Sequence, residues 1–176
     1  MKIRTAKISD QQAIQELYLN SFPINENERV AELAIDLLSE KHLPSVISLV
    51  STNDGDIIAH IAFSPVTTLL EDKLAAYLLA PLAVSPKHQK SGVGSRLVRQ
   101  GLKELSALGI GHVLVYGDPN YYGRFGFCED IAKGFLPPYE LQFPHGWLGL
   151  RMGNSTQTSR SDRISCIQAL QDPALW

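Results

Sequence analysis

The sequence contains few cysteines and no long apolar run. Its two cysteines, Cys128 and Cys166, lie in no C-x-x-C motif and beside no cluster of histidines, which argues against a disulfide framework and against a bound metal. No stretch approaches the roughly 20 apolar residues that a membrane-spanning helix needs. Residues 1–10 lack the apolar run of a signal peptide. We therefore expect a soluble cytoplasmic protein with no membrane partner.

The sequence also lacks an excess of positive charge. Its 16 Lys and Arg against 18 Asp and Glu give a formal net charge of -2, which disfavours a general affinity for nucleic acid. The charge is nevertheless uneven, because residues 87–103 carry five basic and no acidic residues, which leaves -7 for the rest of the chain. With 176 residues, 44% of them hydrophobic, we expect one domain over residues 1–152. Residues 153–176 are expected to form a tail, partly ordered or a short helix.

Hydrophobic periodicity predicts alternating strands and helices before the tail. Ser9 followed by Gln12 matches a capping box and predicts the start of the first helix. Turns at 53–56 and at Glu71-Asp72-Lys73 join three strands into an antiparallel meander. The expected strands are 2–8, 46–51, 57–66, 74–84, 112–116 and 147–152, and the expected helices start near Ser9, Asn25 or Asn27, Val93 and Asn120.

The helix from Val93 is the longest one expected, and it ends near Gly109. Its position between two strands predicts a crossover that leaves strands 74–84 and 112–116 parallel. Its predicted apolar face consists of Val93, Leu97, Val98, Leu102, Leu105 and Leu108.

The segment before this helix carries closely spaced glycines. Backbone N–H groups at a helix N-terminus are unpaired and lie at the positive end of the helix dipole, so they attract anions. A P-loop requires GxxxxGK[ST], and a dinucleotide fingerprint requires a third glycine where Leu97 stands. The remaining pattern is Gln-x-x-Gly-x-Gly, with Gln89, Gly92 and Gly94. It predicts an anion-binding turn suited to phosphate.

This turn and a second motif resemble those of the GNAT superfamily of N-acetyltransferases. The second motif is Tyr-x-x-x-Gly-Phe, formed by Tyr122, Gly126 and Phe127. Residues 117–127, together with 60–66, are similar to the YhbS-like branch of predicted acetyltransferases. The resemblance covers about residues 1–152. It implies an α/β GNAT fold with a mixed, mostly antiparallel sheet of six or seven strands and four flanking helices.

The resemblance implies acetyl-coenzyme A as cosubstrate, with its pyrophosphate on the turn and its pantetheine arm on the strand before it. It implies transfer of acetyl to a primary amine, of a small molecule or a protein, by direct attack in a ternary complex. For Asn120, helix capping is an equal alternative to binding pantetheine. Lys87 and Arg96 are further candidates for the phosphates. The implied coenzyme-binding residues are Leu82, Ala83, Val84, Gln89, Lys90, Ser91, Gly92, Val93, Gly94, Ser95 and Asn120.

Tyr122 matches the general acid of the family. A phenol pKa near ~10 lies close enough to a thiol's ~8.5 for Tyr122 to donate a proton or a hydrogen bond to the leaving sulfur. Packing within an aromatic cluster is the alternative for this residue. For the general base, Glu28 is the candidate, although a helix-dipole role explains Glu28 nearly as well. His60 could act as a base, but we interpret it as a hydrogen-bonded structural residue.

The acceptor side has no motif that identifies the amine. Residues 22–43 and 133–145 are implied to flank it, and the prolines at 137–138 and at 144 favour a semi-rigid loop that shapes the acceptor pocket. A sensor of acyl-coenzyme A that signals without turnover is the alternative function. Whether the chain forms a homodimer is left open.

Overall fold

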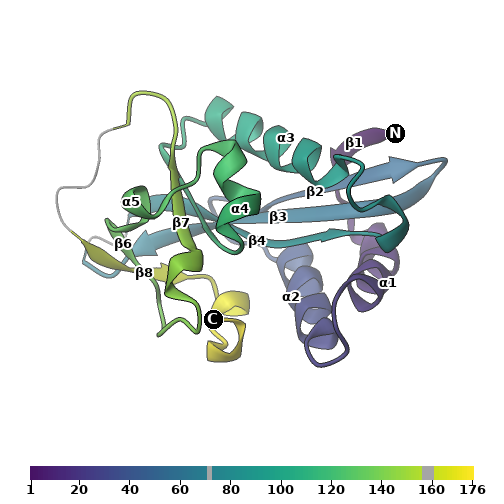
Figure 1. Ribbon diagram of the computed structural model, residues 1–176, viewed down its shortest axis with the longest axis horizontal. Helices are drawn as coiled ribbons and strands as arrows, with labels where there is room; N and C mark the ends of the chain where they lie inside the picture. Colours follow the sequence, from purple (N-terminus) through teal and green to yellow (C-terminus); the bar gives the residue numbers. More distant parts are fainter. Residues whose placement is uncertain (71–72, 156–160) are drawn as a thin grey trace. The chain divides into compact units, whose positions relative to one another are not determined.

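The computed structural model describes residues 1–70, 73–155 and 161–176 (Figure 1). The predicted turn at Glu71-Asp72-Lys73 and the middle of the predicted tail therefore lie partly outside the described residues. The strands are β1 (Lys2–Thr5), β2 (Ile47–Asn53), β3 (Asp56–Thr68), β4 (Leu74–Val84), β5 (His112–Tyr116), β6 (Phe135–Leu136), β7 (Trp147–Arg151) and β8 (Asp162–Cys166). The α-helices are α1 (Gln11–Ser21), α2 (Asn27–Ser39), α3 (Val93–Ala107), α4 (Pro119–Tyr122) and α5 (Glu129–Ala132).

The strands form a mixed sheet in the order β1-β2-β3-β4-β5-β7, and β8 pairs with β3 and β6. The pairs β1–β2, β2–β3, β3–β8 and β5–β7 are antiparallel, whereas β4–β5 and β6–β8 are parallel. The predicted parallel pairing across the long helix is therefore confirmed. The described residues contain eight strands and five α-helices, because they add the two-residue β6, β8 and the one-turn α5 to the elements expected from sequence.

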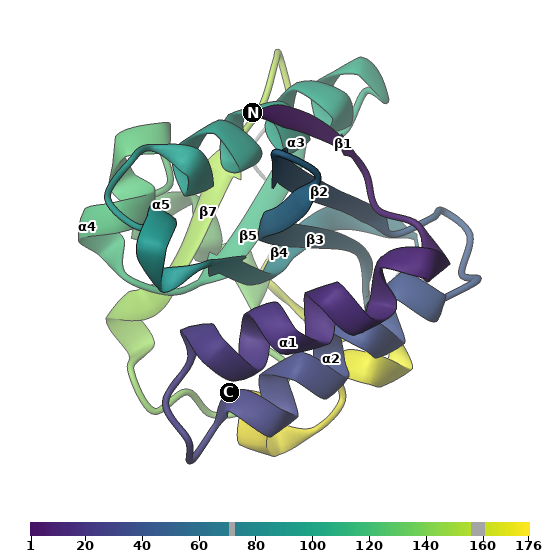
Figure 2. The same ribbon diagram turned by 90° about the vertical axis from the view of Figure 1, so that its right-hand side faces the viewer.

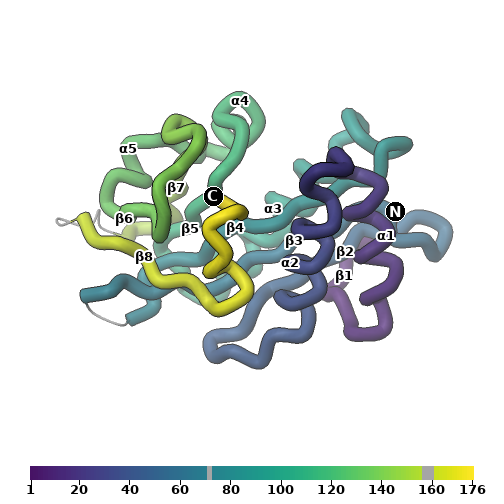
Figure 3. The backbone as a smooth tube through the Cα atoms, turned by 90° about the horizontal axis from the view of Figure 1, so that it is seen from below, coloured from purple at the N-terminus to yellow at the C-terminus, as the bar shows by residue number. Residues whose placement is uncertain are grey.

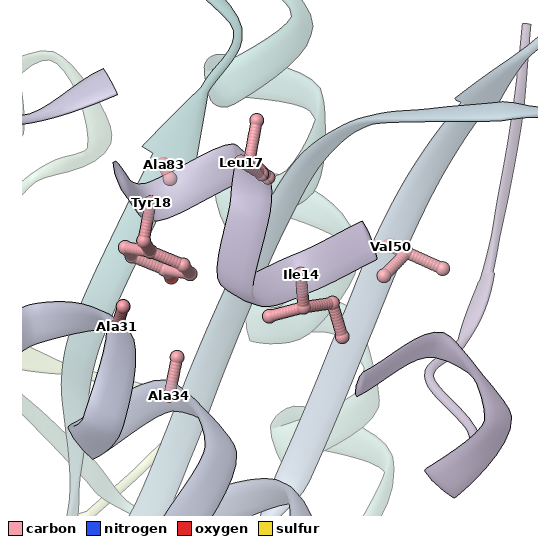
Figure 4. Packing of buried hydrophobic residues seen from close by; sticks show 7 residues of the cluster. All are labelled: Ile14, Leu17, Tyr18, Ala31, Ala34, Val50 and Ala83. Carbon is pink, nitrogen blue, oxygen red and sulfur yellow. The ribbon is translucent and has the colours of Figure 1, made fainter. Parts of the chain in front are cut away.

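The chain forms two compact units, and the first comprises residues 1–63 and 80–103. In this unit α1 and α2 lie side by side against the strands (Figure 2). Their inward faces are apolar, and they bury Ile14, Tyr18 and Ala34 completely. These side chains pack with Val50 of β2 and Ala83 of β4 (Figure 4). Burial of this amphipathic surface is what orders the two helices.

Helix α3 covers the opposite face of the strands in the same unit. Successive side chains of a strand point to opposite faces, so Phe63 of β3 faces away from the side on which His60 meets α1. A Cβ atom built on Gly101 of α3 would lie 2.1 Å from Cε2 of Phe63. Only glycine allows α3 to lie this close to the ring. On the predicted apolar face of α3, Val93, Leu97, Val98 and Leu105 are buried and Leu102 is half-buried. Leu108 follows the end of the helix and is exposed.

The second unit comprises residues 64–79 and 104–176. Strand β5 pairs with β4 on one side and with β7 on the other. The C-terminal segment returns as β8 along β6 (Figure 3). The apolar residues of β5, from Val113 to Val115, are fully buried.

Two local predictions are corrected by the structure. Ser9 does not cap the first helix. It lies inside a 3-10 turn formed by Ile8–Asp10, and Asp10 is the residue that precedes α1. The Asp10 carboxylate accepts bonds from Arg4 at 2.6 and 2.9 Å and from the backbone N–H of Lys7 at 2.8 Å. In the tail, where a partly ordered segment or a short helix was expected, residues 162–166 form a strand, because β3 and β6 offer edges for pairing.

Candidate functional site

The turn between β4 and α3, in the first unit, has the backbone shape of an anion site. After β4 ends at Val84, Pro86–His88 forms a 3-10 turn and α3 begins at Val93. Lys90 and Gly92 adopt left-handed conformations, with φ of 59° and 83°. Such residues turn neighbouring backbone N–H groups to one side, which creates a concave surface for anions. Lys90 is the unusual member, because a residue with a Cβ atom rarely adopts a positive φ.

The space in front of the turn is open. A Cβ atom built on Gly92 would meet no atom within 4 Å, so a ligand can approach the backbone there. Helix α3 is 15 residues long, and its first N–H groups lack partners within the helix. The basic side chains of Lys87, Lys90 and Arg96 are exposed around the turn. The turn therefore fits a diphosphate group.

Side-chain bonds hold the turn in this shape. The side-chain amide of Gln89 donates to the carbonyl oxygen of Val84 at 3.1 Å, and Ser91 Oγ donates to the carbonyl of His88. Ser21, at the end of α1, donates to the same Val84 carbonyl at 3.2 Å. Gln89 thus supports the turn through its amide group, and Ser21 is a supporting residue that the sequence did not reveal.

The strand before the turn has one buried and two half-buried residues. Ala83 packs into the cluster with Tyr18 and Val50, whereas Leu82 and Val84 are half-buried. The pairing of β4 with β5 runs from Tyr77 to Leu79 and so ends before these residues.

Tyr122 lies at the end of α4, in the second unit. Its ring makes edge contacts with Tyr121 and Phe127, at centroid distances of 5.0 and 5.8 Å. A Cβ atom built on Gly117 would lie 2.5 Å from Cε2 of Tyr122, so the ring rests directly on the Gly117 backbone. Gly117 is a second supporting residue that the sequence did not reveal, since the Gly117-Asp118-Pro119 sequence reads only as a turn.

The hydroxyl of Tyr122 has no hydrogen-bond partner among the described residues, and the residue as a whole is half-buried. Burial, with smaller contributions from Tyr121 and Asp118, raises the pKa of Tyr122 above its ordinary value of 10.0. The phenol is therefore neutral at physiological pH and can donate its proton in a hydrogen bond. Both predicted roles, aromatic packing and a donor function, are compatible with this geometry.

Asn120 does not cap its helix. The cap is Asp118, whose carboxylate accepts a bond from the backbone N–H of Asn120 at 2.9 Å. The side chain of Asn120 is exposed, so the capping alternative is wrong and the pantetheine alternative stays a prediction.

His60 is a structural residue, as interpreted from sequence. Its ring is fully buried, with Nδ1 at 2.9 Å from Tyr18 Oη and Nε2 at 2.8 Å from Ser48 Oγ. Burial lowers the pKa of His60 from 6.5 to about 3, and the charge of Asp10 opposes this only in part. Both ring nitrogens are engaged, so His60 links α1 to β2 and β3.

Glu28 lies exposed in the first turn of α2. This position is as favourable for the helix dipole as for an incoming amine. The neighbouring Asn27 is buried and donates from its side-chain amide to the carbonyl of Leu19 at 2.9 Å.

The described ranges hold no group of three or more His, Cys, Asp or Glu that could bind a metal ion. Among the described helices, none is long and apolar enough to cross a membrane.

Comparisons with known proteins agree with these features. The sequence model of the Acetyltransferase (GNAT) family matches residues 11–127. The chain is 36% identical over 140 residues to the N-acetyltransferase YjhQ of Escherichia coli K12, covering 78% of this chain and 75% of YjhQ. It is 39% identical over 128 residues to the N-acetyltransferase YhbS of the same strain, covering 72% of this chain and 73% of YhbS.

Two solved structures share the fold over nearly the whole chain. The crystal structure of YhbS from Escherichia coli in complex with CoA has a TM-score of 0.83 and 28% identity, covering 96% of this chain and 90% of that one. A GNAT family acetyltransferase from Brucella melitensis in complex with acetyl-CoA has a TM-score of 0.75 and 29% identity, covering 96% of each chain. The expected GNAT fold and the resemblance to YhbS are confirmed, and the chain belongs to the Acetyltransferase (GNAT) family.

Proposed function

We propose that the protein transfers the acetyl group of acetyl-coenzyme A to a primary amine by direct attack in a ternary complex. The open turn at the start of α3 carries this proposal, because its left-handed backbone and the positive end of α3 suit a diphosphate. CoA and acetyl-CoA in the two related structures support the choice of ligand. We assign the transferase domain to residues 1–152. The proposed coenzyme-binding residues are Leu82, Ala83, Val84, Gln89, Lys90, Ser91, Gly92, Val93, Gly94, Ser95 and Asn120.

The acetyl donor supplies a thioester, and the chain needs to orient the amine, accept its proton and assist the departing sulfur. Tyr122 is the proposed donor to the sulfur. Because the ordinary pKa of a phenol already exceeds that of a thiol, and burial raises the pKa of Tyr122 further, complete proton transfer from the phenol is uphill. Tyr122 therefore acts chiefly as a hydrogen-bond donor that stabilises the developing thiolate.

Glu28 is the proposed carboxylate that attracts the cationic amine and accepts its proton through water. Its exposed position at the start of α2 keeps the carboxylate accessible to a ligand. A Glu28→Gln variant should raise the KM for the amine and shift the pH profile of turnover. If neither changes, the helix-dipole role is sufficient for Glu28.

Release of free thiol from acetyl-coenzyme A, measured with a panel of primary amines, tests the proposed function. At least one amine should raise the rate above the amine-free background, and the acetylated product should appear by mass spectrometry in equal amount. Calorimetric titration with coenzyme A should be run in parallel. Coenzyme binding without release of thiol by any amine would overturn the transferase proposal and favour a sensor.

A further inference from the structure

The C-terminal segment 162–176 is bonded along a loop of the same unit, residues 137–146. Arg163 donates from its guanidinium to the carbonyl oxygens of Pro137 and Pro138, at 2.7 and 3.2 Å. Tyr139 donates from its hydroxyl to the carbonyl of Gln171 at 2.6 Å. The loop is therefore tied to the segment at its beginning.

The other end of the segment reaches the same loop. The backbone N–H of Gln142 donates to the main-chain oxygen of Trp176 at 3.3 Å. Trp176 is only 5% exposed, and its indole N–H donates to the carbonyl of Leu170 at 3.1 Å. A buried tryptophan whose N–H is paired is well suited to fix neighbouring groups.

Trp176 lies within a cluster of aromatic rings. It stacks on Tyr116, at the end of β5, with a centroid distance of 6.4 Å and an interplanar angle of 12°. Trp147 meets it edge-on at 5.9 Å, and Tyr139 lies at 6.5 Å. The three partner rings come from β5, the loop and β7, so Trp176 joins the loop to these two strands.

The contacts continue from this cluster to Tyr122. Tyr116 Oη accepts a bond from the backbone N–H of Phe143 at 2.9 Å, and the N–H of Gly117 donates to the carbonyl of Gly146 at 2.9 Å. A Cβ atom on Gly146 would lie 3.1 Å from the carbonyl oxygen of Gly117 and from the Tyr116 ring. Gly117 is also the residue on which the Tyr122 ring rests. The loop thus packs against the residue that supports Tyr122.

We infer that residues 162–176 form a clasp that holds the loop 137–146 against the end of β5, and that the clasped loop positions the amine acceptor relative to Tyr122. The inference rests on the proposed transferase function. The loop is suited to this role because Phe143 and His145 are exposed on it while its backbone is fixed. Exposed side chains on a fixed loop are a common source of specificity. Trp176 and Tyr139 are positioning residues, since they act through the loop.

Hydrogen exchange tests the clasp without using activity. Trp176→Ala removes the central ring, and Tyr139→Phe removes only the bond to Gln171, so the second variant remains informative if the first folds poorly. In either variant the amides of Gln142, Phe143 and Gly146 should exchange faster, by about fivefold to tenfold for the loss of one hydrogen bond. The β5 amides should keep their protection. Leu108→Ala, at an exposed site of the same unit, is the control.

Steady-state kinetics with the amine panel test the role of the loop. The clasp variants should raise the KM for amines and change the relative rates between amines, while the dissociation constant for coenzyme A stays within about twofold. Unchanged exchange of the loop amides would overturn the clasp. Faster exchange with unchanged relative rates would overturn its role in acceptor positioning. If the wild-type protein acetylates no amine, the transferase proposal and the acceptor role both fail, and amide exchange still decides whether the clasp exists.

Discussion

The shape of the turn between β4 and α3 depends mainly on its backbone conformation, whereas the surroundings of Tyr122 are shaped by packed side chains. In the turn, positive φ angles at Lys90 and Gly92 create a concave backbone surface, and the glycine spacing in the sequence predicts it. Around Tyr122, the ring is held by Tyr121, Phe127 and the backbone of Gly117. The difference predicts that changes in the turn affect coenzyme binding, and that changes around Tyr122 affect turnover.

Removal of the Tyr122 hydroxyl should have the largest effect. A positioned hydrogen-bond donor to a developing anion contributes about 10²- to 10³-fold to rate, so Tyr122→Phe should lower kcat by about that factor. The dissociation constant for coenzyme A, measured by calorimetry, should hardly change. A variant with normal kcat would remove Tyr122 from the chemistry and leave it as a packing residue.

Acid should lower the stability of the first unit, because His60 is buried in its neutral form. An unfolded chain protonates this ring below about pH 6.5, whereas the folded ring resists protonation until about pH 3. The unfolded state therefore binds more protons between these values, and the free energy of unfolding falls as the pH falls through this window. The full shift corresponds to about 5 kcal/mol at most.

Denaturant titrations from pH 7 to pH 4 would measure this effect. His60→Gln should flatten the fall in stability, whatever its effect at pH 7. His112→Gln, in the second unit, should flatten it less, because that ring is less completely buried. An equal pH dependence in the wild-type and His60→Gln proteins would contradict the assignment to His60.

Gly92→Ala should weaken coenzyme binding with a smaller effect than the first change. Alanine at the observed φ of 83° costs about 1–2 kcal/mol, so the turn should relax away from the binding shape. We expect the dissociation constant for coenzyme A to rise about tenfold, in proportion to that strain. At saturating coenzyme, kcat should be preserved.

Gly55→Ala is the matched control, because Gly55 also has a positive φ and open space around it but lies in the turn between β2 and β3. It should lose comparable stability without losing affinity. A similar loss of affinity in both variants would show that the effect of Gly92→Ala is not local.

Gly117→Ala should have the smallest effect of the series. The added Cβ would overlap the Tyr122 ring and displace the hydroxyl, so kcat should fall about fivefold to tenfold, within the range for a slightly misplaced catalytic group. In a Tyr122→Phe background the same change should have little further effect on kcat. Gly123→Ala, where a Cβ would meet nothing within 4 Å, is the control. Additive losses in the double variant would indicate that Gly117 acts independently of Tyr122.

The features predicted correctly were those encoded over short stretches of sequence. The start of α2, most of the apolar spacing on α3, the strand before the glycine turn and the parallel β4–β5 pair all follow from local periodicity and element order. The interpretation of His60 was also confirmed, since a lone histidine within a strand is usually hydrogen-bonded.

The features missed depend on residues far apart in sequence. Strand β8 pairs Cys166 with Val66, a partner that no local pattern in the polar tail indicates. Tertiary packing likewise determines that Trp176 stacks on Tyr116. It also determines that the Tyr122 ring lies against the backbone of Gly117. Leu108 was misplaced because the helical period was extended past the last turn of α3.

The left-handed conformation of Lys90 also has a kinetic consequence. A positive φ at a residue with a side chain costs free energy, and the chain bears this cost when it folds and not when a ligand binds. A turn that already has the shape its proposed ligand needs avoids reordering at each encounter, so we expect association to depend on diffusion and on attraction to the exposed Lys87, Lys90 and Arg96. Added salt should then slow association by screening these charges, whereas changes in the glycines of the turn should act on the dissociation rate.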